Sequence, residues 1–140
     1  MPAAIECAVD ANVILRFVLG DDPGLSAKAR TVFEAMERGE VVLACDPVNL
    51  AEAVWVLASY YRASGADIAD ALLPLVKAAG FHVPEKDRYV QALELFGQGV
   101  LRFGDACACA TAIAAGSGRL ISFDRRLSSV HGIRRIKTVS

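Results

Sequence analysis

The chain has 140 residues, of which 54% are apolar, and its formal net charge at pH 7 is −1. This length favours a single domain, residues 1–140, that buries about two thirds of its unfolded surface. A charge so close to zero excludes a protein that attracts nucleic acid through a global positive field.

Short apolar runs alternate with longer helical patterns along the chain. The sequence predicts strands at Ile5–Asp10, Val41–Cys45, Phe81–Val83, Arg119–Phe123 and Ile133–Val139. It predicts helices at Ala11–Leu19, Gly24–Arg38, Pro47–Ala63, Ala66–Ala79, Lys86–Gly97 and Asp105–Ala115. This alternation implies right-handed βαβ units, and therefore an α/β fold with a mostly parallel sheet between helices. Ligands of such sheets bind beyond the carboxyl ends of the strands.

Several features favour a soluble protein of the cytoplasm. Glu6 and Asp10 interrupt the N-terminal apolar run, so no signal peptide is expected. The longest apolar stretch, Val41–Tyr61, contains two acids and a proline, which argues against a membrane span. The four cysteines include no CxxC pair and the chain has only two histidines. We therefore expect neither zinc nor disulfides, and we interpret the thiols as buried side chains in a reducing compartment.

Three aspartates stand at the predicted carboxyl ends of strands or at the beginnings of helices. Asp10 ends the first strand, Asp124 follows the LISF strand, and Asp105 precedes an alanine-rich helix. Each aspartate, taken alone, is explained equally well as the N-cap of the helix or turn that follows. Capping therefore remains open as an alternative to a functional role.

Glu52 lies on a helix that offers it no local partner. The residues three and four positions away are mostly apolar, and Val41–Tyr61 contains no Lys or Arg. A carboxylate on so apolar a helix is costly unless another group compensates it. One alternative is a long-range ion pair with Arg62 or Arg102.

A shared role explains the four acids together, since all are predicted to lie at one edge of the sheet. Carboxylates that converge raise one another's pKa unless a cation neutralises them. Oxygen ligands without nearby Cys or His favour Mg²⁺ or Mn²⁺. Such a metal supports phosphodiester hydrolysis by activating water and stabilising charge on the phosphate. From Arg119 onward the chain contains six Lys or Arg residues and one acid, Asp124. This local excess of positive charge indicates an anionic partner.

Four segments of the sequence resemble, in order and spacing, those that carry the acids of PIN domains. The segments are VDANVILRFVLGDDP, LAEAVWVL, FGDACACATA and LISFDRRL. The resemblance covers essentially the whole chain and extends to the VapC-type toxins of bacterial toxin–antitoxin pairs. It implies a three-layer α/β/α fold around one mostly parallel five-stranded sheet with the strand order 3-2-1-4-5.

The resemblance also implies which residues form the site. The metal-binding acids of the family carry over to Asp10, Glu52, Asp105 and Asp124. Glu52 would either bind a second metal or orient the attacking water. Asn12 falls where the family often has a polar residue near the metal, and Ser122 stands where Thr is more usual.

The implied function is that of a Mg²⁺- or Mn²⁺-dependent endoribonuclease. It would be the toxin of a type II toxin–antitoxin system, would form a homodimer, and would be inhibited by a cognate VapB-type antitoxin. We expect Arg16, Arg125 and Arg126 near the RNA backbone, with ordinary surface arginines as the alternative. A PIN-like module that only binds RNA or a protein is the non-enzyme alternative.

Two other α/β classes fit the residues less well. A phosphatase of the haloacid-dehalogenase type would need a second Asp at the position of Asn12. A receiver-like phosphoacceptor would need a Lys near the end of its last strand, and Lys137 is a poor candidate among arginines. Neither class accounts for all four acids.

Overall fold

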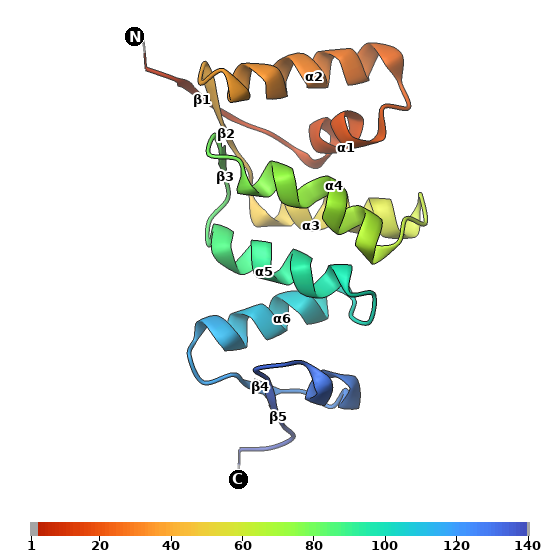
Figure 1. The fold of residues 1–140 in the computed structure, drawn as a ribbon, viewed down its shortest axis with the longest axis vertical. Coiled ribbons are helices and arrows are strands. Elements are labelled where there is room, and N and C mark those ends of the chain that lie inside the picture. Colours follow the sequence, from red (N-terminus) through yellow and green to blue (C-terminus); the bar gives the residue numbers. More distant parts are fainter. Residues whose placement is uncertain (1–2, 140) are drawn as a thin grey trace.

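Two short parallel sheets organise the chain in the computed structural model, which describes residues 3–139. The first sheet has the order β1-β2-β3 and contains β1 (Ile5–Ala8), β2 (Val41–Ala44) and β3 (Phe81–His82). The second sheet pairs β4 (Arg119–Ile121) with β5 (Arg134–Ile136). The molecule is elongated, with β1 toward one end and the β4–β5 pair at the other (Figure 1).

Within residues 3–139, six α-helices and one 3₁₀ helix lie between and around these strands. They are α1 (Ala11–Leu19), α2 (Pro23–Glu37), α3 (Pro47–Ser59), α4 (Gly65–Lys77), α5 (Lys86–Gly97), α6 (Phe103–Ala114) and the 3₁₀ helix η1 (Arg125–Ser129). From the β1 end of the molecule they follow one another as α2, α1, the α3–α4 pair, α5 and α6 (Figure 1). Side-chain caps from Asp10, Asp22, Asp46 and Ser64 begin the first four.

The predicted alternation of strands and helices is confirmed, whereas the single five-stranded sheet is not what the structure contains. Among residues 3–139, β1 pairs only with β2, so the order 3-2-1-4-5 is interrupted between β1 and β4. The reason is the packing of α5 and α6. Phe96 and Phe103 meet edge to face, with ring centroids 5.7 Å apart, and α6 thereby carries β4 away from β1.

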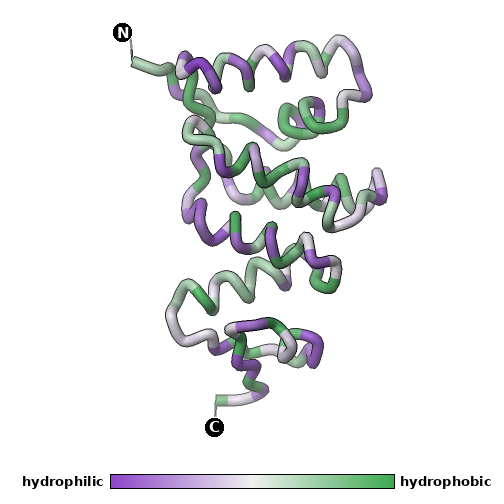
Figure 2. The backbone as a smooth tube through the Cα atoms, in the orientation of Figure 1, coloured by the Kyte–Doolittle hydropathy of each residue, from purple (hydrophilic) through white to green (hydrophobic). Residues whose placement is uncertain are grey.

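One apolar cluster extends through the helices and the first sheet. Ile14 of α1, Phe33 of α2, Leu50 of α3, Leu72 of α4 and Leu93 of α5 are all almost completely buried. Burial of a side chain of this size contributes about 1.5–3 kcal/mol. Figure 2 shows α1 mostly green, whereas α2 alternates between purple and green, as expected for a helix with one buried side.

The contact between α4 and α5 requires glycine. A Cβ on Gly65 would stand 2.5 Å from the carbonyl oxygen of Phe96, closer than non-bonded atoms approach. A Cβ on Gly97 would similarly crowd the Cβ of Ala69, at 2.9 Å. The two helices therefore touch backbone to backbone at this end. This contact joins the part of the molecule that holds the first sheet to the part that holds the second.

The cysteines are free, and they differ in exposure. Cys45 and Cys109 are buried, as the sequence predicts, and Cys107 is half-buried. Burial raises the pKa of the Cys45 and Cys107 thiols to about 11 in each case. Cys7 is the exception, because it lies exposed on β1. None of the helices within residues 3–139 combines the length and apolar composition that a membrane crossing requires.

Candidate active site

Asp10 lies just beyond the carboxyl end of β1 and caps α1. Its Oδ1 accepts a hydrogen bond of 3.1 Å from the backbone amide of Val13. The capping alternative is therefore correct for this residue, yet the side chain remains exposed to solvent. Capping and a second role are compatible, because a carboxylate has about four acceptor positions.

Glu52, in the second turn of α3, faces the same hollow as Asp10. The hollow has a volume of about 270 Å³, and its polar lining comes from Asp10, Asn12, Asn49 and Glu52. Among residues 3–139, no ion pair joins Glu52 to Arg62 or Arg102, so the proposed long-range partners are not engaged. We call Asp10 and Glu52 the first acid pair.

Asn49 is a site residue that the sequence reasoning missed. Its Oδ1 accepts a hydrogen bond of 3.0 Å from the backbone amide of Ala11, which links α3 to the first turn of α1. This contact orients the two helices so that Asp10 and Glu52 face one hollow. The available signal was the spacing: Asn49 lies three residues before Glu52, on the same side of the helix.

Asp105 and Asp124 form a second acid pair, and Arg126 bridges them. The Nη2 atom of Arg126 lies 2.5 Å from Asp124 Oδ2 and 3.7 Å from Asp105 Oδ2. Asp124 also caps η1, because its Oδ1 accepts a hydrogen bond of 3.0 Å from the Arg126 amide. The hydrogen bonds from Arg126 lower the pKa of Asp124 to about 2.

Asp105 is not a helix cap, because α6 begins at Phe103 and Asp105 lies within its first turn. A carboxylate there interacts favourably with the partial positive charge of the helix N-terminus. Ser122 supports the neighbouring Asp124: its Oγ accepts a hydrogen bond of 3.0 Å from the Asp124 amide. Arg135 donates from Nη1 to the Ser122 carbonyl oxygen at 2.9 Å. These contacts fix the turn that follows β4.

The three arginines singled out from the sequence lie in different environments. Arg16 forms an ion pair with Asp21, with 3.1 Å between Nη1 and Oδ1. Arg125 is exposed at the beginning of η1. Arg126 is already bound to the second acid pair. Of these three arginines, Arg125 is the one that is exposed and has no ion pair among residues 3–139.

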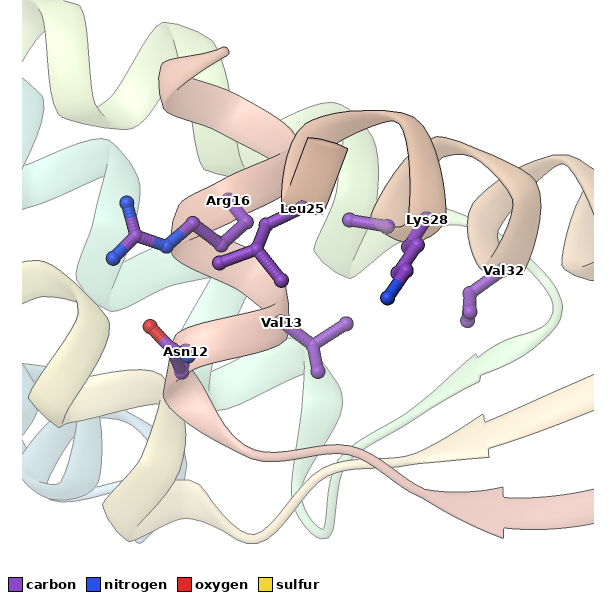
Figure 3. A pocket seen from close by; sticks show the side chains of 7 residues that line it. Asn12, Val13, Arg16, Leu25, Lys28 and Val32 are labelled. Carbon is purple, nitrogen blue, oxygen red and sulfur yellow. The ribbon is translucent and has the colours of Figure 1, made fainter. Parts of the chain in front are cut away.

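A second hollow, of about 230 Å³, lies between α1 and α2 beside the first acid pair. Figure 3 shows its lining side chains, with Arg16 and Lys28 on either side of Leu25. Lys28 is a cation that the sequence reasoning missed, because a lone lysine on an exposed helix side carries no distinctive pattern. Asn12 lines both this hollow and the one that holds the first acid pair.

The described chain does not fit a divalent metal with all four acids at once. Residues 3–139 contain no group of three or more Asp, Glu, His or Cys side chains placed to hold a metal ion. The first acid pair supplies two carboxylates to its hollow, and Arg126 occupies the space between the carboxylates of the second. The structure thus brings the acids together in two pairs and keeps the pairs apart.

The fold and the site define an α/β protein with acidic side chains beyond the ends of parallel strands, at the position where such folds bind ligands. The chain belongs to the PIN domain family, whose model matches residues 7–133. No curated protein and no solved structure matched the chain. PIN domains are generally nuclease modules, usually depend on divalent metal ions, and suggest RNA as the substrate.

Proposed function

We propose that the chain is a divalent-metal-dependent endoribonuclease, a single PIN domain over residues 1–140 that cleaves RNA phosphodiester bonds. The observation that carries this proposal is the first acid pair. Asp10 and Glu52 come from different elements, face one hollow beyond the end of β1, and have no cationic side chain in its lining. Carboxylates so placed repel one another unless a cation joins them.

The donor atoms around this hollow favour a hard cation. Asp10 and Glu52 offer carboxylate oxygens, and Asn12 offers an amide oxygen. Oxygen donors of this kind suit Mg²⁺ or Mn²⁺ better than zinc. The proposal also assigns Asp105 and Asp124 to the metal site. Within residues 3–139 these two acids lie apart from the first pair.

We further propose that the protein is the toxin of a VapBC-type pair, acts in the cytoplasm, forms a homodimer and is inhibited by a VapB-type antitoxin. The second acid pair supports inhibition by an arginine, because Asp105 and Asp124 already bind the guanidinium of Arg126. An antitoxin arginine could bind the first acid pair through the same charge-assisted hydrogen bonds.

A non-catalytic PIN module that binds RNA or a protein is the second candidate function. The observation that favours it is Arg126, which neutralises the second acid pair, so that of the four acids two remain without an ion pair among residues 3–139. Under this alternative the basic segment around η1 would bind the RNA backbone. The protein would retain RNA without cleaving it.

The test compares Asp10→Asn with Asp46→Asn. Asp46 is a matched control, because it follows β2 as Asp10 follows β1, caps α3 through a 2.8 Å bond from Val48, and does not line the hollow. Asparagine caps a helix about as well as aspartate, so both variants should remain about as stable as wild type. We expect wild type and Asp46→Asn to cleave RNA with Mg²⁺ or Mn²⁺, and Asp10→Asn to be inactive. Cleavage that persists in EDTA, or equal activity of the two variants, would contradict the proposal.

A further inference from the structure

A third hollow, with a volume of about 550 Å³, lies where α3, α5 and α6 meet. It is larger than the hollow of the first acid pair, and its volume falls within the range of about 300–1,000 Å³ that ligand sites occupy. Its lining includes Trp55 of α3, Phe96 near the end of α5, and Arg102 and Phe103 at the start of α6. The RNA-cleaving site proposed above does not include this hollow.

Three aromatic side chains make the hollow suited to a flat ring. Phe96 and Phe103 are buried and meet edge to face, with 5.7 Å between their ring centroids, so they form a fixed wall. Trp55 lies in the same lining and is 54% exposed. An aromatic side chain with an accessible face is what proteins use to stack unpaired nucleobases.

Arg102 supplies a positive charge to this aromatic lining. It occupies the N-cap position of α6 and yet makes no side-chain cap hydrogen bond. The side chain is exposed, and within residues 3–139 it forms no ion pair. The lining residues, all in the described part of the chain, include no acid. A free guanidinium beside aromatic rings suits an anion that carries a ring, as a nucleotide does.

The hollow adjoins the helices that carry the two acid pairs. Trp55 follows Glu52 by three residues on α3, so the two side chains lie on one side of that helix, about 4.5 Å apart along its axis. Arg102 precedes Asp105 by three residues at the start of α6. A polynucleotide that stacks on Trp55 is therefore held beside the first acid pair.

We propose that this hollow binds one unpaired nucleotide of the RNA substrate, with its base stacked on Trp55 and a phosphate bonded to Arg102. The identity of the substrate rests on the proposed function. Trp55 and Arg102 are positioning residues, because neither is placed at the reacting phosphate. Every base has a face that stacks, so the hollow selects unpaired nucleotides over paired ones and does not select a particular sequence.

The surroundings of the hollow favour a nucleotide over a protein helix. Glu52 and Ser59, one turn before and one turn after Trp55, are both exposed polar residues. The apolar surface is thus confined to the hollow itself. A protein helix that docks in a groove uses apolar contacts over several successive turns, whereas one base needs a single stacking surface.

The fluorescence of Trp55 tests this proposal directly, because Trp55 is the only tryptophan of the chain. Wild type is titrated with an unstructured RNA oligonucleotide in EDTA, which prevents metal-dependent cleavage. We expect saturable quenching by this RNA and much weaker quenching by the same strand annealed to its complement. Inorganic polyphosphate, which has negative charge and no bases, should not quench. Equal quenching by polyphosphate or by the duplex would overturn the proposal.

Substitutions at Trp55 measure how much the stacking contributes. Trp55→Ala should raise the Kd for a labelled oligonucleotide by about 5- to 150-fold, the range for loss of one stacked base, and Trp55→Phe should restore most of the affinity. The matched control is Tyr60→Ala, which removes an aromatic side chain that is 77% exposed and does not line the hollow. Circular dichroism establishes that the variants are folded. An unchanged Kd in Trp55→Ala, or an equal loss in Tyr60→Ala, would overturn the proposal.

The salt dependence of binding tests the phosphate contact. Loss of one contact to a single strand should lower the slope of log Kd against log salt concentration by about 0.7, and we expect this change in Arg102→Gln. Arg30→Gln, on an exposed side of α2, is the control and should keep the wild-type slope. An unchanged slope in Arg102→Gln would overturn the role assigned to Arg102.

These readouts separate the nucleotide-binding hollow from the proposed catalytic function. Affinities are measured in EDTA, so a loss of affinity in Trp55→Ala supports the hollow whether or not wild type cleaves RNA. In protein that cleaves, Trp55→Ala should raise KM and leave kcat near the wild-type value. Sedimentation tests the other occupant. If Trp55→Ala dissociates a dimer and leaves the RNA affinity unchanged, a second copy covers the hollow and the proposal is overturned.

Discussion

The two acid pairs contain the same kind of side chain and yet differ in how the protein treats their charge. Asp10 and Glu52 face a hollow that no basic residue among residues 3–139 lines. Asp105 and Asp124 share the guanidinium of Arg126, and that contact lowers the pKa of Asp124 to about 2. One pair is left uncompensated, and the other is neutralised within the chain.

The difference shows which features of an acidic site are local and which are not. Asp10 and Asp124 each follow a strand and accept a cap hydrogen bond from a nearby backbone amide, whereas Asp105 lies in the first turn of α6. Charge compensation depends on the neighbours that the fold supplies. Arg126, two residues away, forms an ion pair with Asp124, whereas no basic side chain within residues 3–139 forms one with Asp10.

The largest expected effect comes from removing the charge of Glu52, the second member of the first acid pair. Glu52→Gln keeps the shape of the side chain and removes its charge, so we expect RNA cleavage to fall by about 100-fold or more, the range for loss of a positioned acid or base. Glu94→Gln, on an exposed side of α5, is the matched control and should cleave like wild type. Initial rates on one RNA substrate measure both. Similar rates for the two variants would remove Glu52 from the site.

A smaller effect is expected at the α4–α5 contact that joins the two regions. Gly65→Ala forces a methyl group against the Phe96 carbonyl, and overpacking of this kind costs about 1–3 kcal/mol in the free energy of unfolding. Gly24→Ala, near the start of α2, meets no atom closer than 3.7 Å and should be neutral or stabilising by up to about 1 kcal/mol. Urea denaturation compares the variants. Equal stability would mean that the two helices separate readily.

Much of this architecture follows from local patterns in the sequence. Strand and helix alternation, the caps at Asp10 and Asp46, and the burial of Cys45 and Cys109 all follow from residue type and spacing. The order of the strands in the sheets does not follow from local patterns. It depends on the position of α6, which packs on α5, and on the position of α5, which packs on α4. The expected single sheet was therefore wrong between β1 and β4.

The candidate site shows the same division. Proximity of Asp10 to Glu52 was predictable from the carboxyl ends of adjacent strands, whereas the bridging position of Arg126 was not, since it depends on the turn after β4. Asn49 and Lys28 were missed because an amide or a lone lysine on a helix has many ordinary roles. Only their contacts distinguish them.

The smallest expected effect concerns the charge of Asp124. Its pKa is lowered in the fold, so the Arg126 contact stabilises the protein above the ordinary pKa of 3.8, and this contribution is lost as the pH falls toward about 2. Arg126→Gln should return the pKa of Asp124 toward 3.8, and Arg125→Gln should leave it low. Carboxyl ¹³C NMR titration measures the value directly. A pKa that stays near 2 without Arg126 would contradict the assigned cause.

The most direct test of the central claim, that the first acid pair belongs to a metal-dependent RNA-cleaving site, is to add Mg²⁺ or Mn²⁺ stepwise to EDTA-treated protein and measure RNA cleavage. We expect cleavage by wild type to rise with the metal concentration and Asp10→Asn to stay inactive at every concentration. Cleavage by wild type without metal, or an equal rise in Asp10→Asn, would contradict the claim.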